Sequence, residues 1–287
     1  MDIVVALQSL AAPELDALTV AVTNLGSERA YIVLLVVTYL AIDARAGRTL
    51  GLALLGGYYL NQQLKETFDT LRPFVLHPEL LRGGAATLET ATGPAFPSGH
   101  AQGAATFWGL AAMLARRRAV TLLAALVILS VGASRVYLGV HWPVDVAAGM
   151  AIGLAVAGVA YGLVRSRIAL SIATRLLAFV VLPLGLHIGM PTPESGLLAG
   201  AVAAFGTAPM LHVHRARGGV AARTGLALLG LTLVFAWLAG SSLALPQVWK
   251  DHVLIEPARY LILGWAGLVA APWLATRSGL LPRIGAR

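Results

Sequence analysis

The sequence contains no cysteine, and only 12% of its 287 residues are charged. The lack of cysteine excludes disulfide bonds, thiolate metal ligands and a cysteine nucleophile, so any covalent catalysis must use another nucleophile. The low charge excludes an ordinary soluble domain, in which about a quarter of the residues are charged. Biased low-complexity tracts are also missing, so we expect no long disordered region and no flexible linker between domains.

Hydrophobic residues, in contrast, make up 58% of the chain, and its mean hydropathy is +0.79. Lipid is therefore the expected solvent for most of the surface. The apolar stretches suit helices, which cross a bilayer with about 20 residues, and not barrel strands, which are about 10 residues long and alternate in polarity. We predict an all-α fold, a polytopic transmembrane helix bundle with about nine spans, near residues 30–43, 49–68, 99–115, 119–138, 143–164, 169–189, 195–212, 222–240 and 257–276.

The N-terminal residues differ from these spans, because Pro13, Glu14 and Asp16 interrupt their apolar character. Two short helices that lie in the membrane interface are expected here rather than a crossing helix. Residues 1–10 lack the basic region and the cleavage site of a signal peptide, which favours a mature N-terminus. The predicted organisation is an interfacial segment at 1–28, a core at 29–167 and an additional four-span membrane region at 168–287.

Basic residues predict how the helices are oriented. One group of them falls on alternate ends of successive spans, and by the positive-inside rule that side is cytoplasmic. The protein is then expected in a cell inner or plasma membrane, with residues 1–28 outside and the C-terminus in the cytoplasm. The formal charge is +8, but the basic residues form no stripe, so we expect membrane lipid and not nucleic acid as a partner. The cytoplasmic group holds fourteen of the 21 basic residues: Arg45, Arg48, Arg116, Arg117, Arg118, Arg165, Arg167, Arg175, Arg215, Arg217, Arg223, Arg277, Arg283 and Arg287.

Glycines at a spacing of four residues recur in the predicted spans. Small residues at this spacing let two helices approach closely. We expect these glycines to pack helices within one bundle, and the alternative is a seam between two copies of the chain in a homodimer. The pairs are Gly99 with Gly103, Gly149 with Gly153, Gly158 with Gly162, and Gly196 with Gly200.

Three short segments concentrate polar residues at the outer ends of spans. Since each segment lies where a helix meets the outer surface, the three can converge on one site at the same depth. Ionisable groups at such positions are candidates for function. The segments are Lys65-x6-Arg72-Pro73, Pro97-Ser98-Gly99-His100 and Ser134-Arg135-x5-His141-x3-Asp145.

The first segment offers two cations. Lys65 and Arg72 are seven residues apart, which predicts two helical turns on one face, and Pro73 is expected to end or turn that helix. An arginine fork beside a lysine point charge suits an anion with several oxygens. The alternative role for both side chains is contact with lipid headgroups.

The second segment predicts the start of a helix. Ser98 can cap that helix, and Gly99 lets its backbone approach a ligand. The helix N-terminus then offers amide donors to a phosphate. His100, in the first turn, can act as a general acid, although a histidine with a purely structural role at the cap is the alternative.

The third segment pairs a histidine with a carboxylate. Asp145 follows His141 by four residues, so a helix that begins near Trp142 places the carboxylate beside the imidazole. Two histidines and an aspartate can also bind a metal, but three cations nearby would repel a divalent ion. We expect no metal, and we interpret His212 and His214, which lie between arginines, as loop surface rather than a metal site.

Together, the three segments resemble the signature of the type 2 phosphatidic acid phosphatase family of integral membrane lipid phosphatases. The resemblance covers about residues 50–165 and implies that no cofactor is needed. It also implies that His141 is the nucleophile, that Asp145 orients it and that His100 protonates the leaving alcohol. Ser134 is a weaker candidate. The residues implied to hold the phosphoryl oxygens are Lys65, Arg72, Ser98, Gly99 and Arg135.

The expected function is hydrolysis of a lipid phosphate or pyrophosphate at the extracytoplasmic face through a phosphohistidine. Undecaprenyl pyrophosphate, phosphatidic acid and phosphatidylglycerophosphate all fit as substrates, and the outward site favours the first. One alternative is a lipid-binding or lipid-translocating membrane protein that uses the site as a headgroup receptor. Another is phosphotransfer to an acceptor other than water, which would proceed through the same phosphohistidine.

Overall fold

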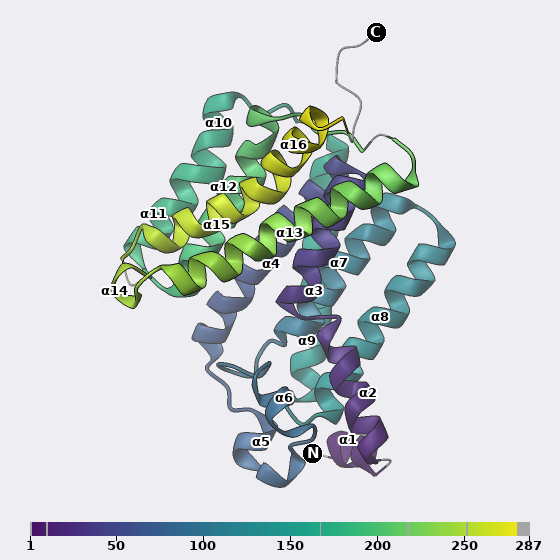
Figure 1. The fold of residues 1–287 in the computed structure, drawn as a ribbon. Coiled ribbons are helices and arrows are strands. Elements are labelled where there is room, and N and C mark those ends of the chain that lie inside the picture. The colour runs from purple at the N-terminus through teal and green to yellow at the C-terminus, as the bar shows by residue number, and fades with distance from the viewer. Residues whose placement is uncertain (1, 10, 167, 217, 251, 280–287) are drawn as a thin grey trace. The chain divides into compact units, whose positions relative to one another are not determined.

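A computed structural model describes residues 2–9, 11–166, 168–216, 218–250 and 252–279. Throughout these ranges the regular structure is helical and no strand occurs, which confirms the all-α class (Figure 1). The chain forms two compact units: residues 1–32 with 56–167, and residues 33–55 with 168–287. The boundary between them runs through helices α3 (Glu28–Val37) and α4 (Ala44–Phe68). The functional division that we placed after residues 28 and 167 stays a prediction.

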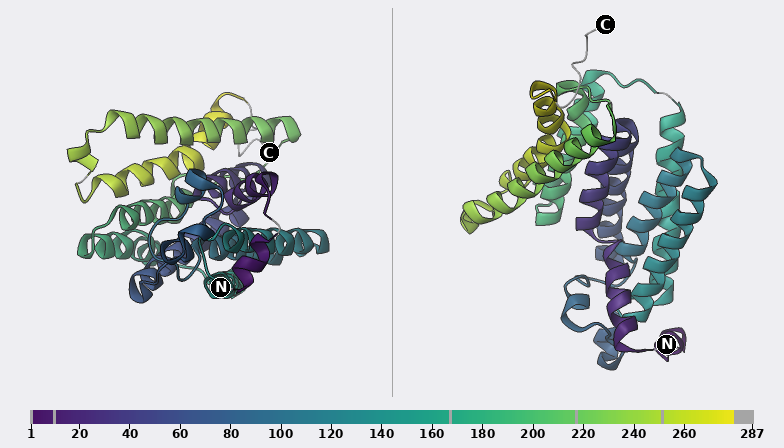
Figure 2. Two further views of the ribbon diagram at one scale, coloured as in Figure 1. Left: turned by 90° about the horizontal axis from the view of Figure 1, so that it is seen from below. Right: turned by 45° about the vertical axis from the view of Figure 1, so that its right-hand side comes forward.

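Three long helices form the body of the first unit. They are α7 (Gly99–Ala115), α8 (Arg118–Tyr137) and α9 (Pro143–Ser166), which lie side by side in two views (Figures 1 and 2). The N-terminal helices α1 (Asp2–Gln8) and α2 (Pro13–Asn24) pack against α8. Buried alanine and valine side chains dominate the contact between α7 and α8, as expected for helices that approach closely.

Glycines bring α9 against α7. A Cβ atom at Gly149 would lie 2.6 Å from the Ser98 carbonyl oxygen, and one at Gly153 would lie 2.4 Å from the Gln102 carbonyl oxygen. Only glycine permits these backbone approaches, so this pair packs helices within the bundle as predicted. Gly158 and Gly162 meet no neighbour within 4 Å in the described part of the chain. For those two positions the homodimer alternative stays open.

The segment between α4 and α7 contains three short helices. They are α5 (Pro73–Leu76), the 3₁₀ turn η2 (Pro78–Leu80) and α6 (Gly84–Leu88). Each has too few residues for a periodic pattern, and for this reason the sequence did not predict them. A buried apolar cluster fixes this segment to the end of α8 and to α2; it includes Ala91, Tyr137, Leu138 and Val140.

The second unit contains the remaining helices. Besides parts of α3 and α4 it holds η1 (Thr38–Ile42), α10 (Ile172–Leu176), η3 (Leu177–Val181), α11 (Leu182–Gly189), α12 (Pro193–Leu211), α13 (Val220–Ala244), α14 (Gln247–Lys250), α15 (Ile255–Trp265), η4 (Ala266–Ala270) and α16 (Ala271–Arg277). A Cβ at Gly200 would lie 2.2 Å from the Pro257 carbonyl oxygen, so Gly196 and Gly200 also pack helices, here α12 against α15.

One expectation about this unit is wrong. His214 is buried, because its Nε2 bonds the Leu40 carbonyl oxygen at 3.0 Å and its ring lies against Tyr39. The arginines beside it in the sequence predicted loop surface. Instead, the imidazole bonds a carbonyl oxygen near the C-terminal end of η1, where helix carbonyls need partners outside the helix. His212 lies outside the helices, as expected for a loop, but it is half-buried.

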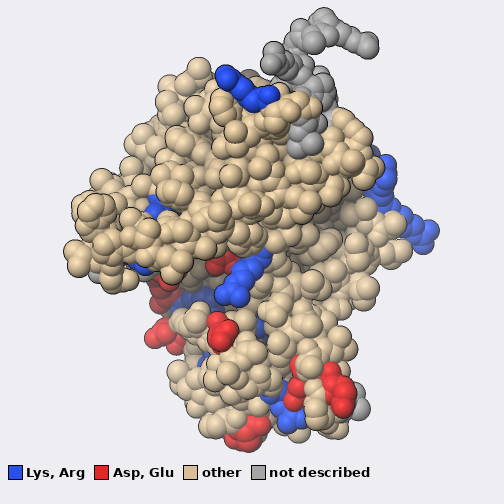
Figure 3. All heavy atoms as spheres, viewed as in Figure 1, with Lys and Arg blue, Asp and Glu red and all other residues tan. Residues whose placement is uncertain are grey.

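Five of the described helices or helix runs are long and apolar enough to cross a membrane, namely α8, α9, the run from α10 to α11, α13 and the run from α15 to α16. The count becomes six if the bent pair α1 and α2 forms one broken span. Most of the face in Figure 3 carries neither acidic nor basic side chains, as expected for contact with lipid. The chain is therefore a helical membrane protein. The total of nine spans and the interfacial placement of α1 and α2 stay predictions.

Candidate active site

Four helices of the first unit bring the three polar segments to one end of that unit. Lys65 lies in the last turn of α4, Ser98 directly precedes α7, and Arg135 lies in the last turn of α8. His141 lies in the turn between α8 and α9, and Asp145 lies in the first turn of α9. These five side chains are all buried. Buried charge without a partner is costly, so their contacts identify what the site is arranged to hold.

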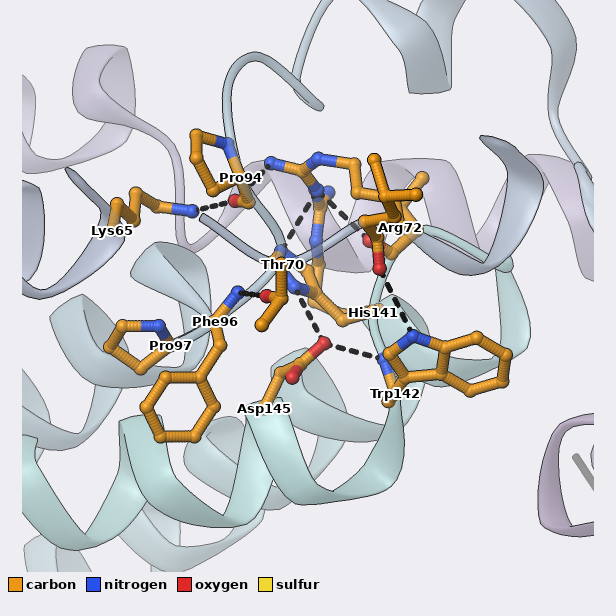
Figure 4. Close-up of polar contacts among 12 residues, drawn as sticks. Lys65, Thr70, Arg72, Pro94, Phe96, Pro97, His141, Trp142 and Asp145 are labelled. Atoms are coloured by element: carbon orange, nitrogen blue, oxygen red, sulfur yellow. Dashed lines mark hydrogen bonds and ion pairs between the residues drawn. The ribbon is translucent and has the colours of Figure 1, made fainter. Parts of the chain in front are cut away.

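His141 is held between a cation and a carboxylate (Figure 4). Its Nε2 lies 3.1 Å from Nη1 of Arg72, and its Nδ1 lies 3.6 Å from Oδ2 of Asp145. A guanidinium can only donate, so Nε2 must accept with its lone pair, and the proton of the neutral ring is then on Nδ1, facing the carboxylate. This tautomer leaves Nε2 as the nitrogen able to attack phosphorus.

Asp145 also fixes the backbone around it. Its Oδ2 accepts a hydrogen bond from the Trp142 amide at 2.8 Å, and its carbonyl oxygen accepts one from the Ser98 amide at 3.0 Å. The indole of Trp142 donates to the Leu71 carbonyl oxygen at 3.2 Å. One aspartate therefore connects the start of α9, the start of α7 and the nucleophile. The spacing of four residues between His141 and Asp145 led us to expect this proximity.

Arg72 is the most highly bonded side chain of the site. Its five N–H groups all have acceptors, four of which are backbone carbonyl oxygens. The acceptors are the carbonyls of Gly93 (2.8 Å), Val140 (2.9 Å), Thr92 (2.7 Å) and Pro94 (3.3 Å), together with Nε2 of His141 (3.1 Å). A phosphoryl oxygen can reach this guanidinium only by replacing one of these acceptors.

The predicted helical spacing of Lys65 and Arg72 is wrong. Helix α4 ends at Phe68, Asp69 follows in the left-handed region with φ of 40°, and Arg72 has extended backbone directly before α5. Pro73 begins α5 and does not end the preceding helix, because α4 already ends at Phe68. The two cations still meet, since both donate to the Pro94 carbonyl oxygen (Figure 4).

Arg135 contacts two threonines. Its Nη1 donates to Oγ1 of Thr23 and to Oγ1 of Thr90, each at 2.9 Å, and its Nη2 donates to the Thr90 carbonyl oxygen at 3.0 Å. Its Nε is buried and has no acceptor in the described part of the chain. Thr23, on α2, was not predicted to belong to the site, because a threonine within a broken apolar segment gives no sequence signal.

The start of α7 differs from the expectation for Ser98. That residue directly precedes the helix, but its side chain makes no cap hydrogen bond, and Oγ is buried without a partner among the described residues. Nε2 of His100 is likewise buried and has no hydrogen-bond partner among the described residues. Gly99 lies close to Asn61, whose Oδ1 would be 3.2 Å from an added Cβ. The hydroxyl and the imidazole thus remain available to a ligand. Ser134 donates to the Val131 carbonyl oxygen of its own helix at 2.7 Å.

Two buried side-chain amides, those of Asn61 and Gln102, stabilise the start of α7. Nδ2 of Asn61 donates to Oε1 of Gln102 at 2.8 Å and to the Pro97 carbonyl oxygen at 3.3 Å, and Gln102 donates to the Gly57 carbonyl oxygen at 2.6 Å. These bonds tie α4 to α7 beside Gly99. We did not predict them, although an asparagine inside an apolar span is itself a signal of a buried polar partner.

Burial and charge set the protonation of His141. Burial lowers the pKa of His141 well below its usual range, and the positive charges of Arg72, Arg135 and Lys65 lower it further. Burial also lowers the pKa of Arg72, to about 10, so its guanidinium stays charged near neutral pH. The site therefore combines a neutral imidazole with fixed cations. In the described residues, no three His, Asp or Glu side chains lie close enough to hold a metal ion.

Residues 46–169 match the family model of the PAP2 superfamily. This part of the chain belongs to that superfamily. The match contains all three polar segments, so the family resemblance that they predicted is confirmed. No curated protein matches the chain significantly.

Two solved structures are similar to part of the chain. LpxE from Aquifex aeolicus has 23% sequence identity and a TM-score of 0.49, and the similarity covers 56% of this chain and 93% of LpxE. A transmembrane PAP2 type phosphatidylglycerolphosphate phosphatase from Bacillus subtilis has 25% identity and a TM-score of 0.48, with 59% and 86% covered.

Proposed function

We propose that this protein hydrolyses phosphate or pyrophosphate groups of membrane lipids through a covalent phosphohistidine on His141. The observation that carries the proposal is the arrangement of His141, whose Nε2 faces the guanidinium of Arg72 while Nδ1 faces the carboxylate of Asp145. A neutral, oriented imidazole among cations suits attack on an anionic phosphoryl group. Membership of residues 46–169 in the PAP2 superfamily supports the same reaction class.

In the first step, Nε2 of His141 forms a bond to phosphorus while the bond from phosphorus to the leaving oxygen breaks. His100 donates a proton to that oxygen, which departs as a lipid alcohol or, from a pyrophosphate, as a lipid monophosphate. The carboxylate of Asp145 stabilises the positive charge that develops on the imidazole ring. Lys65 and Arg135 stabilise the phosphoryl oxygens, whose negative charge increases during transfer.

In the second step, water attacks the phosphohistidine. His100, now neutral, accepts a proton from the water, the bond from Nε2 to phosphorus breaks, and inorganic phosphate leaves. The histidine returns to its initial tautomer with Nδ1 protonated. Each cycle thus consumes one lipid phosphate and one water, and no step requires a metal ion or another cofactor.

Substrate binding must change the contacts of Arg72. Since all five of its N–H groups have protein acceptors, one of the four carbonyl oxygens, or Nε2 of His141, has to release a donor to the phosphoryl group. Loss of the contact with Nε2 is the simplest exchange, because attack uses the same lone pair that accepts this hydrogen bond. Arg72 would then exchange its hydrogen bond to His141 for one to the phosphoryl group when the substrate binds.

The site faces the extracytoplasmic side in this proposal. Helices α7 and α8 carry His100 and Arg135 at one end, and Arg116, Arg117 and Arg118 lie at their opposite ends. A basic cluster at that end favours the cytoplasm by the positive-inside rule, so the site and the C-terminus are expected on opposite sides. Outer-leaflet lipids are then the accessible substrates, which favours a polyprenyl pyrophosphate over phosphatidic acid and phosphatidylglycerophosphate.

Phosphate release tests the proposal directly. The purified protein in detergent is incubated with phosphatidic acid, phosphatidylglycerophosphate and undecaprenyl pyrophosphate, each in excess EDTA. We expect phosphate from at least one of them, with the pyrophosphate as the best substrate. Binding without turnover on all three would instead support a lipid receptor. Activity that is lost in EDTA and restored by magnesium or zinc would contradict the metal-free mechanism.

A further inference from the structure

The N-terminal helix α2 lies outside the residues that match the PAP2 superfamily, yet it contacts the site. Its Thr23 is fully buried and accepts a hydrogen bond at 2.9 Å from Nη1 of Arg135. Earlier residues of the N-terminal segment also bond the end of α8: Gln8 donates to the Tyr137 carbonyl oxygen at 2.7 Å, and the Tyr137 hydroxyl donates to Asp16.

The last turn before α3 brings the same segment against the proposed acid. A Cβ at Gly26 would lie 3.3 Å from the carbonyl oxygen of His100, 3.4 Å from its Cβ and 2.9 Å from Cγ1 of Val131. A side chain at this position would force Val131 or His100 to shift, so glycine allows the close approach to α7 and α8. The N-terminal segment therefore contacts both the helix that carries His100 and the helix that carries Arg135.

The donors of Arg135 show what this contact achieves. Thr23 and Thr90 together accept three of its five N–H groups, two from Nη1 and one from Nη2. One N–H on Nη2 remains, as does the N–H of Nε, which is buried and has no acceptor in the described part of the chain. A buried, charged donor without a partner is costly, and a phosphoryl oxygen is the ligand that would satisfy it.

We propose that Thr23 is a positioning residue for phosphoryl transfer: it fixes Arg135 so that the remaining N–H groups bind the phosphoryl oxygens. This inference rests on the proposed function of the site. It makes α2 part of the catalytic unit, in addition to any role that the helix has in the membrane interface. The acceptors on Thr23 and Thr90 are neutral hydroxyl and carbonyl oxygens. They therefore fix the guanidinium of Arg135 without neutralising the positive charge that stabilises the phosphoryl group.

The test uses three variants of the full chain. Thr23→Val keeps the shape of the side chain and removes the acceptor, whereas Thr23→Ser keeps the acceptor. Thr19→Val is the matched control, because Thr19 is on the same helix and its hydroxyl bonds the carbonyl oxygens of its own turn, at Leu15 and Asp16. Thermal unfolding of each purified variant measures whether the fold is retained.

Two quantities are measured on each variant: kcat and KM for lipid phosphate hydrolysis, and the affinity for orthovanadate by titration calorimetry. Vanadate resembles the transferring phosphoryl group, so its binding reports on Arg135 independently of turnover. For Thr23→Val we expect kcat/KM to fall about tenfold, mainly through kcat, as is typical when a hydrogen bond to a charged group is lost. Vanadate should bind about tenfold more weakly, while Thr23→Ser and Thr19→Val stay within about twofold of the wild type.

The outcomes separate this inference from the proposed function. If Thr23→Val retains wild-type kcat/KM and vanadate affinity, or if Thr19→Val falls equally, Thr23 has no positioning role even though the enzyme is a phosphatase. If the wild type binds vanadate but hydrolyses no lipid phosphate, the proposed function is wrong, and the vanadate affinities still decide the role of Thr23. A wild type that neither binds vanadate nor releases phosphate overturns both.

Discussion

The replacement Arg72→Lys tests the central contact of the site. Lysine has three N–H donors, so at least two of the five acceptors of Arg72 must lose their partner. Thr92 and Gly93 are exposed residues at which water can replace a lost donor, but Val140 is buried. An unsatisfied buried carbonyl costs about 1–3 kcal/mol, so we expect a moderate loss of stability. Unfolding is followed by heating the detergent-solubilised protein.

The effect on catalysis should be larger than the effect on stability. A lysine retains the charge but cannot present the planar fork to the phosphoryl oxygens. Removal of one preorganised donor to a transition state typically lowers kcat by about 10²–10³-fold, and we expect a loss in that range. Arg118→Lys is the matched control, because Arg118 is exposed and begins α8 at the end remote from Arg135. A kcat within about twofold of wild type for Arg72→Lys would show that Arg72 does not contact the transferring group.

The remaining predictions concern the nucleophile, the pH profile and the orientation in the membrane. His141→Ala should lower turnover on the order of 10³-fold or more, and acid-quenched reactions with labelled substrate should show no label on this variant; label that persists would assign the nucleophile elsewhere. Because burial lowers the pKa of His141 below its usual 6.5, the imidazole stays neutral as the pH falls through 6.5, and the acid limb of kcat/KM should lie below that value; a limb at or above it would contradict the neutral nucleophile. In a chain without cysteine, a single cysteine at Ala85 should react with a membrane-impermeant maleimide in intact cells or spheroplasts and one at Ala216 should not, whereas the reverse pattern would place the site in the cytoplasm.

The sequence predicted which charged residues meet, because ionisable groups at the ends of apolar spans have few alternatives to a common polar site. It also predicted the proximity of His141 and Asp145, since α9 begins at Pro143, as expected for a proline in the first turn of a helix. The family resemblance rested on the same residues. Helix periodicity, however, misplaced Arg72, because the pattern required helix up to Arg72, whereas α4 ends at Phe68 and the left-handed Asp69 follows.

Contacts that use the backbone or single hydroxyls left no trace in the sequence. Thr23 and Thr90 are ordinary residues for a surface turn or a helix, and nothing in their neighbourhood signals that they hold Arg135. Likewise, Ser98 has the residue type of a helix cap, but its hydroxyl makes no cap hydrogen bond. Such roles depend on which chain segments fold against one another, and periodicity and residue type describe only one segment at a time.

The partners of the cations explain how the site can be both rigid and strongly positive. Within the described part of the chain, no carboxylate forms an ion pair with Lys65, Arg72 or Arg135; their hydrogen bonds end on carbonyl oxygens, hydroxyls and one imidazole nitrogen. Neutral acceptors fix the geometry of a cation but do not neutralise it, whereas a carboxylate would do both. Asp145 contacts the nucleophile and a backbone amide, and among the described residues it forms no ion pair with a lysine or an arginine. The positive charge therefore stays available for a phosphoryl group, which is the charge balance that transfer without a metal requires.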